Sequence, residues 1–148
     1  MNLTNFTRHT LHGLEGVAVV VETVKSDAEA DGLNIEEIQT DVELKLVQAG
    51  IKVLHHDEWM ETAGHPWLYV SVNTMKYLAS YFFSIDVQLK QDVSLPRDPS
   101  ILTSSATWEV GSIGFAVPQS FPEKIRESVD VYVTDFISDF LAANAASA

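Results

Sequence analysis

The chain has 148 residues, 46% of them hydrophobic and 20% charged, which is typical of a single globular domain rather than of a disordered chain. Its formal charge of −12 excludes the basic surface that nucleic-acid binding requires, and the longest apolar run, residues 17–21, is too short for membrane insertion. The absence of cysteine excludes disulfides, thiolate catalysis and thiolate metal sites.

The first third of the chain contains one strand pattern and one helix pattern. Residues 1–13 lack periodicity and are predicted to form a loose lead-in, while the Val-rich segment Leu14–Val24 is typical of a strand covered on both faces. A polar loop is expected over Ser26–Gly32. A helix is then predicted from its N-cap at Asn34 to Gly50, with an apolar stripe formed by Ile35, Ile38, Val42, Leu46 and Ala49.

Strand patterns dominate the middle of the chain. A short strand is predicted at Ile51–Leu54, followed by a loop over His55–Pro66 and a second strand at Trp67–Asn73. The clearest alternation in the chain runs from Tyr81 to Lys90. Its inward face consists of Tyr81, Phe83, Ile85, Val87 and Leu89.

Proline and glycine residues divide the next segment. Pro96 and Pro99 predict a long connection, after which a strand resumes near Ser104. Gly111 and Gly114 indicate a bulge or bend rather than a phosphate-binding turn.

The last element is a helix predicted to begin after Ser120, and residues 143–148 are expected to fray. Its apolar stripe consists of Ile125, Val129, Val133, Phe136 and Phe140. The order is therefore β-α-β-β-β-β-α. Because each helix has one apolar stripe, both are expected on one face of a mostly antiparallel sheet. The sequence predicts one α+β domain over residues 14–142, folded as a two-layer sandwich.

Side chains around the loop after residue 55 are the best candidates for a binding site. Two tryptophans flank a short segment that contains Gly64 and Pro66, and exposed aromatic residues are enriched at contact surfaces. The predicted contact residues are Trp59, Met60, His65 and Trp67. The competing interpretation is that both tryptophan rings fold back onto the core. The other face of the sheet, with Tyr69 and Phe82 among hydroxyl side chains, is expected to meet water or a partner.

Potential metal ligands are densest at His55, His56 and Asp57. Neighbouring residues at the end of a strand point to opposite faces, so an ordinary polar loop is favoured over a metal site, and no cofactor is expected. The sequence contains no GxSxG motif, and no catalytic residue is predicted. Paired carboxylates distant in sequence leave a hydrolase as a third interpretation.

Three parts of the chain between residues 14 and 91 carry a resemblance to a known family. They are the strand Gly16–Glu22, the helix that runs into a strand at Leu44–Leu54, and the strands Leu68–Asn73 and Tyr81–Gln91. In this order they resemble bacterial cell-envelope domains typified by the N-terminal domain of TolB and by CsgG- and LpoB-like lipoprotein domains. The likeness is one of pattern, and that family has no catalytic residues to carry over. It implies a non-catalytic adaptor or assembly module that acts by protein contact in the periplasm.

The opening residues lack the basic and apolar segments of a secretion signal. The predicted location is therefore periplasmic or envelope-associated if a signal has been removed, and cytoplasmic otherwise. A protein partner is expected, and exposed sheet edges are also compatible with a homodimer.

A second template fits the element order as well. Helix-grip domains hold small apolar molecules between a sheet and a long C-terminal helix, which would be the helix at residues 125–141. A small apolar ligand is therefore the main alternative to a protein partner.

Overall fold

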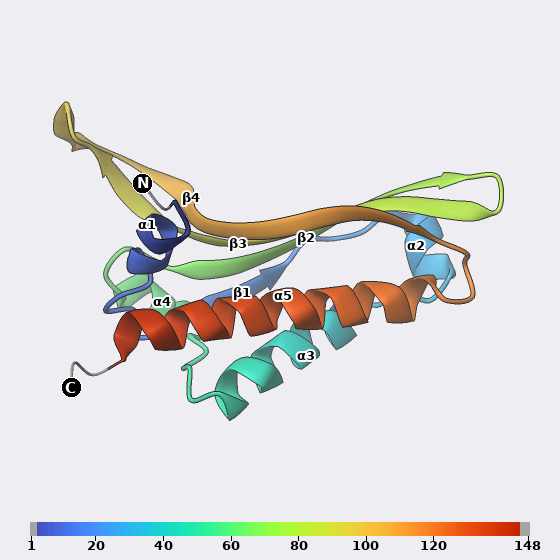
Figure 1. The fold of residues 1–148 in the computed structure, drawn as a ribbon, viewed down its shortest axis with the longest axis horizontal. Coiled ribbons are helices and arrows are strands. Elements are labelled where there is room, and N and C mark those ends of the chain that lie inside the picture. Colours follow the sequence, from blue (N-terminus) through green and yellow to red (C-terminus); the bar gives the residue numbers. More distant parts are fainter. Residues whose placement is uncertain (1–2, 146–148) are drawn as a thin grey trace.

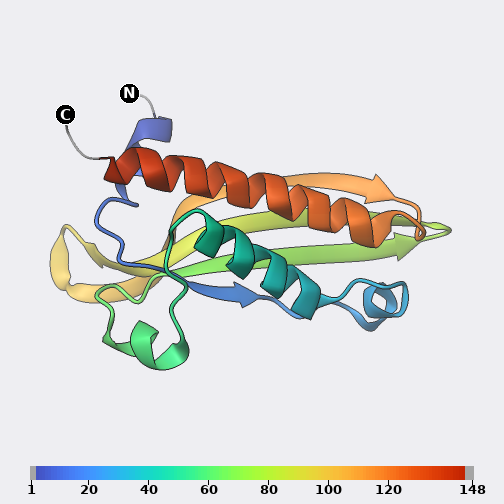
Figure 2. The ribbon, with the colours of Figure 1, turned by 90° about the horizontal axis from the view of Figure 1, so that it is seen from below.

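The computed structural model describes residues 3–145, with side chains from Phe6 onward. The elements found in this range are α1 Leu3–His9, β1 Ala18–Val21, α2 Ser26–Ala30, α3 Ile35–Gln48, α4 His56–Glu61, β2 Trp67–Tyr77, β3 Ser80–Leu95, β4 Asp98–Ala116 and α5 Phe121–Asn144. The strands form one sheet in the order β1-β2-β3-β4, with β1 parallel to β2 and the other pairs antiparallel. Helices α3 and α5 cover the same face (Figures 1 and 2). The predicted α+β sandwich is confirmed.

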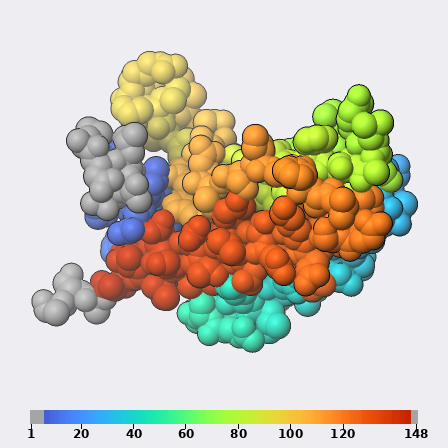
Figure 3. Space-filling view, turned by 45° about the vertical axis from the view of Figure 1, so that its right-hand side comes forward, coloured from blue at the N-terminus to red at the C-terminus, as the bar shows by residue number. Residues whose placement is uncertain are grey.

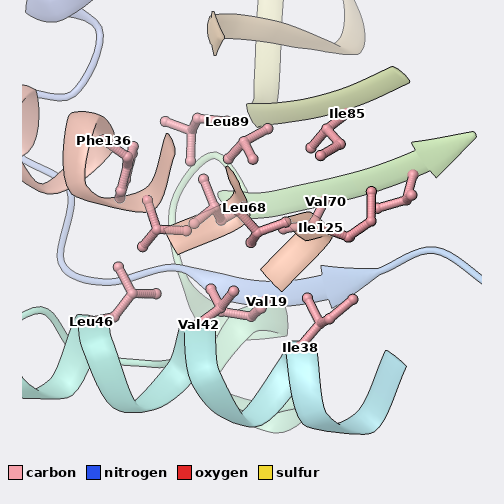
Figure 4. Packing of buried hydrophobic residues seen from close by; sticks show 14 of the residues in the cluster. Val19, Ile38, Val42, Leu46, Leu68, Val70, Ile85, Leu89, Ile125 and Phe136 are labelled. Carbon is pink, nitrogen blue, oxygen red and sulfur yellow. The ribbon is translucent and has the colours of Figure 1, made fainter. Parts of the chain in front are cut away.

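Helix α3 begins and ends as its sequence predicts. The side-chain oxygen of Asn34 accepts hydrogen bonds from the backbone N–H groups of Glu36, at 2.9 Å, and Glu37, at 3.3 Å. Gly50 follows the helix with a φ of +81°, a conformation that glycine adopts without strain. The stripe of Ile38, Val42 and Leu46 is buried against the sheet (Figure 4).

Helix α5 packs its predicted stripe over β3 and β4. The Phe121 ring stacks on Tyr81, with centroids 4.1 Å apart, and Phe136 meets Trp108 edge-on at 5.3 Å. Figure 4 shows the Phe136 and Ile125 side chains between the helices and the sheet residues Leu68, Val70, Ile85 and Leu89. The inner residues of the Tyr81–Lys90 alternation are all buried, as predicted.

The first strand and the one expected after α3 differ from prediction. β1 has four residues, and Val20 is 41% exposed, so the strand is covered on one face and not on both. The predicted strand Ile51–Leu54 is reduced to a single bridge between Val53 and Val17. Val17 donates to Lys52 and accepts from Leu54, while Ala18 donates to Pro66 on the opposite side. Residues 52–54 therefore flank the outer side of the first strand.

The long connection predicted between Pro96 and Pro99 is wrong. β3 continues to Leu95 and β4 begins at Asp98, so the two strands form a hairpin that projects from the body of the molecule (Figures 1 and 3). The pattern failed here because both faces of residues 98–105 are exposed, which removes the alternation.

The two strand glycines mark close contacts rather than a bend. β4 runs through both, and the register shifts of β3 against β4 lie instead between Leu89 and Lys90 and between Ser94 and Leu95. A Cβ at Gly111 would lie 2.4 Å from an Asp86 carboxylate oxygen, and one at Gly114 would lie 2.7 Å from the Phe83 ring. Glycine is therefore required because neighbouring side chains occupy the space.

The loose lead-in predicted for residues 1–13 is also wrong where the structure describes it. Arg8, which belongs to α1, forms an ion pair with Asp139 of α5 at 2.9 Å, and Leu11 is fully buried.

The expected fraying from residue 143 does not begin there, because α5 extends to Asn144; residues 146–148 lie outside the described range. The polar loops predicted at residues 26–32 and 55–66 each contain a short helix, α2 and α4.

Residues 11–13, which follow α1, are fastened to the end of α5. The His12 ring nitrogen Nδ1 donates to the carbonyl of Ala143 at 2.8 Å, the Gly13 N–H donates to the Asn144 side chain at 2.8 Å, and that side chain donates to the Leu11 carbonyl at 2.9 Å. These bonds connect segments 131 and 133 residues apart in the chain.

Across residues 3–145, none of the helices combines the length and the apolar character needed to cross a membrane. Helices α3 and α5 leave the opposite face of the sheet open, as Figure 1 shows. We call this surface the open face.

Candidate functional site

Helix α4 carries Trp59 and Met60 to one end of the open face. Its first turn is held by Glu58, whose carboxylate accepts from the His55 backbone N–H at 3.3 Å and pairs with Lys52 at 2.5 Å. These interactions hold the pKa of Glu58 below its usual range, with the Lys52 hydrogen bond as the largest cause. The helix has fewer than two turns and no apolar stripe, so the periodicity of the sequence could not reveal it.

The loop after α4 is fastened to the end of β3. The Asp92 backbone N–H donates to the Gly64 carbonyl at 2.7 Å, and the His65 ring nitrogen Nδ1 contacts the Asp92 carboxylate at 2.6 Å. That hydrogen bond raises the pKa of His65. His65 has a φ of +44°, which is uncommon for a residue with a side chain, so the loop is strained at the residue that holds it.

The four predicted contact residues line one groove of about 640 Å³. We call it the Trp groove; its lining consists of Ala18, Val20, His56, Trp59, Met60, His65, Trp67, Asp92 and Ser104. The rings are in contact with one another: His56 stacks on Trp59 with centroids 6.1 Å apart, and Trp59 meets His65 at 5.1 Å. Met60 is 53% exposed at the rim.

Neither interpretation of the tryptophans is complete by itself. Both rings are half-buried, so each packs against its neighbours and also presents a face to the groove. The Trp67 ring lies 5.3 Å from Tyr69, and the Lys90 ammonium lies 5.1 Å from the Trp67 ring and 4.4 Å from the Tyr69 ring. In the described part of the chain, the buried indole N–H of Trp59 has no hydrogen-bond partner, so ring contacts hold that side chain.

Sequence reasoning missed the residues that reach the groove through strand pairing. Val20 comes from β1, Asp92 from β3 and Ser104 from β4, and Asp92 and Ser104 are register partners. No local signal identifies them, because only the pairing of distant strands brings them beside α4. His56 was considered as a metal ligand and instead lies in the groove wall.

The run His55, His56 and Asp57 does not converge on one point. His55 precedes α4 as its N-cap, and the next two residues form the exposed first turn. Among residues 3–145, no group of three or more His, Cys, Asp or Glu side chains is arranged to hold a metal ion.

A polar band separates the Trp groove from the far end of the open face. The Glu22 carboxylate accepts hydrogen bonds from the hydroxyls of Tyr69 and Ser71, and these bonds hold the pKa of Glu22 below its usual range. Gln88 donates to Glu109 in the same band at 3.1 Å. The open face is therefore semi-polar in its middle, as the sequence predicts, and apolar toward both ends.

Comparison with known proteins does not name a family, since no model of a known protein family matches the chain and no curated protein matches it.

Proposed function

We propose that the protein is a non-catalytic binding module that acts by protein contact, with the Trp groove as a contact site. One observation carries the proposal: Trp59, Met60, His65 and Trp67 converge from α4, the following loop and β2 onto a single exposed apolar groove. Aromatic side chains at such positions provide a large contact area and lose little entropy on binding, as at the centres of protein interfaces.

The shape of the groove favours a protein over a small molecule. Small-molecule sites are concave and bury most of their ligand. Here Met60 and Val20 are 53% and 41% exposed, so the groove is open to water along these two side chains, as a protein contact surface is.

The packing beneath α5 argues against the helix-grip alternative. A ligand pocket would require space between α5 and the sheet, where Phe121 and Phe136 are fully buried and in ring contact with Tyr81 and Trp108. A ligand could enter only if these contacts were broken.

The hydrolase alternative has one feature in its favour, because Ser104, His65 and Asp92 line the same groove. A serine hydrolase needs the histidine ring to accept the proton of the serine hydroxyl directly. The hydrogen bond that the structure gives to the His65 ring is the one from Nδ1 to Asp92, at 2.6 Å, which joins the loop to the end of β3. The His65–Asp92 pair therefore supports a role in fastening the loop.

The order of elements supports an envelope location as part of the proposal. The resemblance to TolB-type domains is the argument for it, and fractionation of the source cells tests it. Recovery in the cytoplasmic fraction alone would contradict it.

Photocrosslinking in the source cells tests the contact site. A photoreactive residue replaces Met60, and the matched control carries it at Leu141, which is similarly exposed on α5 at 50%. We expect a discrete protein adduct from position 60 that disappears in a second variant, Trp67→Ala. Because Trp67 is half-buried, its truncation should cost about 1–2 kcal/mol, less than the roughly 3–5 kcal/mol of a buried tryptophan, so the variant should remain folded.

Two results would contradict the proposal. One is an equal adduct at both positions, which would indicate non-specific crosslinking. The other is a native mass spectrum in which a small molecule co-purifies with the protein, is released on denaturation and is lost in Trp67→Ala, which would indicate a ligand site.

A further inference from the structure

A second apolar surface lies on the open face, at the end opposite the Trp groove. We call it the distal patch, and it consists of Met75, Tyr77, Phe82, Ile113 and Phe115. Strand register places Met75, Phe82 and Phe115 in one row across three strands, with Ile113 in the adjacent row. Figure 3 shows the β2–β3 hairpin, in light green, beside the end of β4, in orange, where the patch lies.

The distal patch is large for a surface in contact with water. The exposed fractions are 58% for Met75, 62% for Tyr77, 45% for Phe82, 86% for Ile113 and 65% for Phe115. At roughly 200 Å² for each large side chain, these fractions leave about 600 Å² of apolar surface, the upper end of what a monomer usually exposes. A standard interface buries about 800 Å² on each partner, so the patch supplies about three quarters of that area and the polar residues around it would supply the rest.

The patch combines a hollow with an exposed side chain at its edge. A hollow of about 540 Å³ is lined by apolar groups of all three strands, among them Met75, Phe82 and Phe115. Ile113, the most exposed large hydrophobic side chain of the described residues, stands at its edge. A two-fold contact requires one surface to supply both a projection and the hollow that receives it.

The lack of charge on the patch also favours a second copy of the chain as its partner. The five side chains of the patch are uncharged, and its nearest cations are already engaged: Lys124 lies 5.6 Å from the Phe115 ring, and Lys76 pairs with Asp31 at 2.9 Å. A partner selected by charge would have nothing to recognise here. Acidic residues that would repel a second copy lie on both sides of the sheet: Glu37, Asp41 and Glu123 in the groove between α3 and α5, and Glu22 and Glu109 in the polar band of the open face. A contact between two copies is therefore confined to the end of the face beyond that band.

We propose that a second copy of this chain covers the distal patch, forming a two-fold dimer in which the open faces meet at this end. Facing sheets pack with their strands about 30° apart and their side chains interdigitated, which places Ile113 of each copy in the hollow of the other. The inference goes beyond the proposed function, because the Trp groove lies at the opposite end of the face and stays accessible in the dimer.

Sedimentation of the full chain over a concentration series tests the dimer. We expect a monomer–dimer equilibrium in the micromolar range or tighter. Ile113→Lys should weaken it by about tenfold or more, because it buries a charge without a partner. Leu44→Lys makes the same charge change at a residue 55% exposed on α3 and should leave the equilibrium within about twofold of wild type.

Salt gives an independent readout. A chain with a net charge of −12 repels its copy, so raising salt from about 0.01 to 1 M, which shortens the Debye length from roughly 30 to 3 Å, should strengthen the dimer. A wild-type chain that stays monomeric throughout the series, or a dimer that weakens with salt, would overturn the proposal.

The absence of cysteine allows a further check that is independent of how Ile113→Lys folds. Ile113→Cys should be joined to its copy by a short bifunctional thiol reagent much faster than Leu44→Cys at equal concentration. Equal rates for the two variants would also overturn the proposal.

Discussion

At the scale of single residues, the ionisation of His65 controls how firmly the loop of the Trp groove is held. Its pKa is raised because the ring donates a hydrogen bond to the Asp92 carboxylate at 2.6 Å. A group whose pKa is higher in the folded state contributes its stability fully below its ordinary pKa of about 6.5. That contribution is lost as the pH rises through the raised value.

An NMR titration of the His65 ring checks this dependence. We expect a pKa above the ordinary histidine value in the wild-type protein and a return toward that value in Asp92→Asn, which removes the negative charge. Hydrogen exchange at residues 62–66 should also become faster, relative to the intrinsic rate, on the alkaline side of the transition. An identical His65 pKa in both proteins would show that the Asp92 carboxylate does not hold the His65 ring.

At the scale of elements, one carboxylate of α5 holds α1 against the sheet. Asp139 accepts a hydrogen bond from Arg8 in α1 and another from the indole N–H of Trp108, both at 2.9 Å. Because Trp108 is only 5% exposed, removing Asp139 would leave its N–H buried without an acceptor. The attachment of α1 therefore depends on a contact across almost the whole chain.

Replacement of this carboxylate should release α1. We expect Asp139→Ala to lower the free energy of unfolding in urea by about 1–3 kcal/mol and to accelerate hydrogen exchange over Leu3–His9. Asp135→Ala, an exposed position one turn earlier on the same helix, is the control and should stay within about 0.5 kcal/mol of wild type. Unchanged protection of α1 in Asp139→Ala would contradict this role.

The elements that sequence could predict are those with one buried side. Helix α3 and the alternation from Tyr81 to Lys90 are confirmed because burial on one face imposes a period on the sequence. Helix α1 and the start of β4 have no such period: α1 is held by a distant side chain, and residues 98–105 are exposed on both faces. The structure of those segments is determined by residues far away in the sequence, which a local sequence pattern does not include.

At the scale of the whole molecule, one part of the candidate site could be predicted from the sequence and another part could not. Trp59, Met60, His65 and Trp67 lie within nine residues of one another and could be found by composition alone. Val20, Asp92 and Ser104 complete the groove from three strands, and their arrival depends on the register of the sheet.

The hydrogen bonds between residues 11–13 and residues 143 and 144 suggest that the segments of the chain could be connected in a different order without changing the fold. Since these segments are hydrogen-bonded neighbours, a flexible linker could join the ends, and the chain could be reopened in the turn between Leu95 and Asp98. Such a circular permutant should unfold cooperatively in urea with the circular dichroism of the parent chain. If it does, the arrangement in space is the property that the sequence encodes, and the order in which the segments are synthesised is incidental to it.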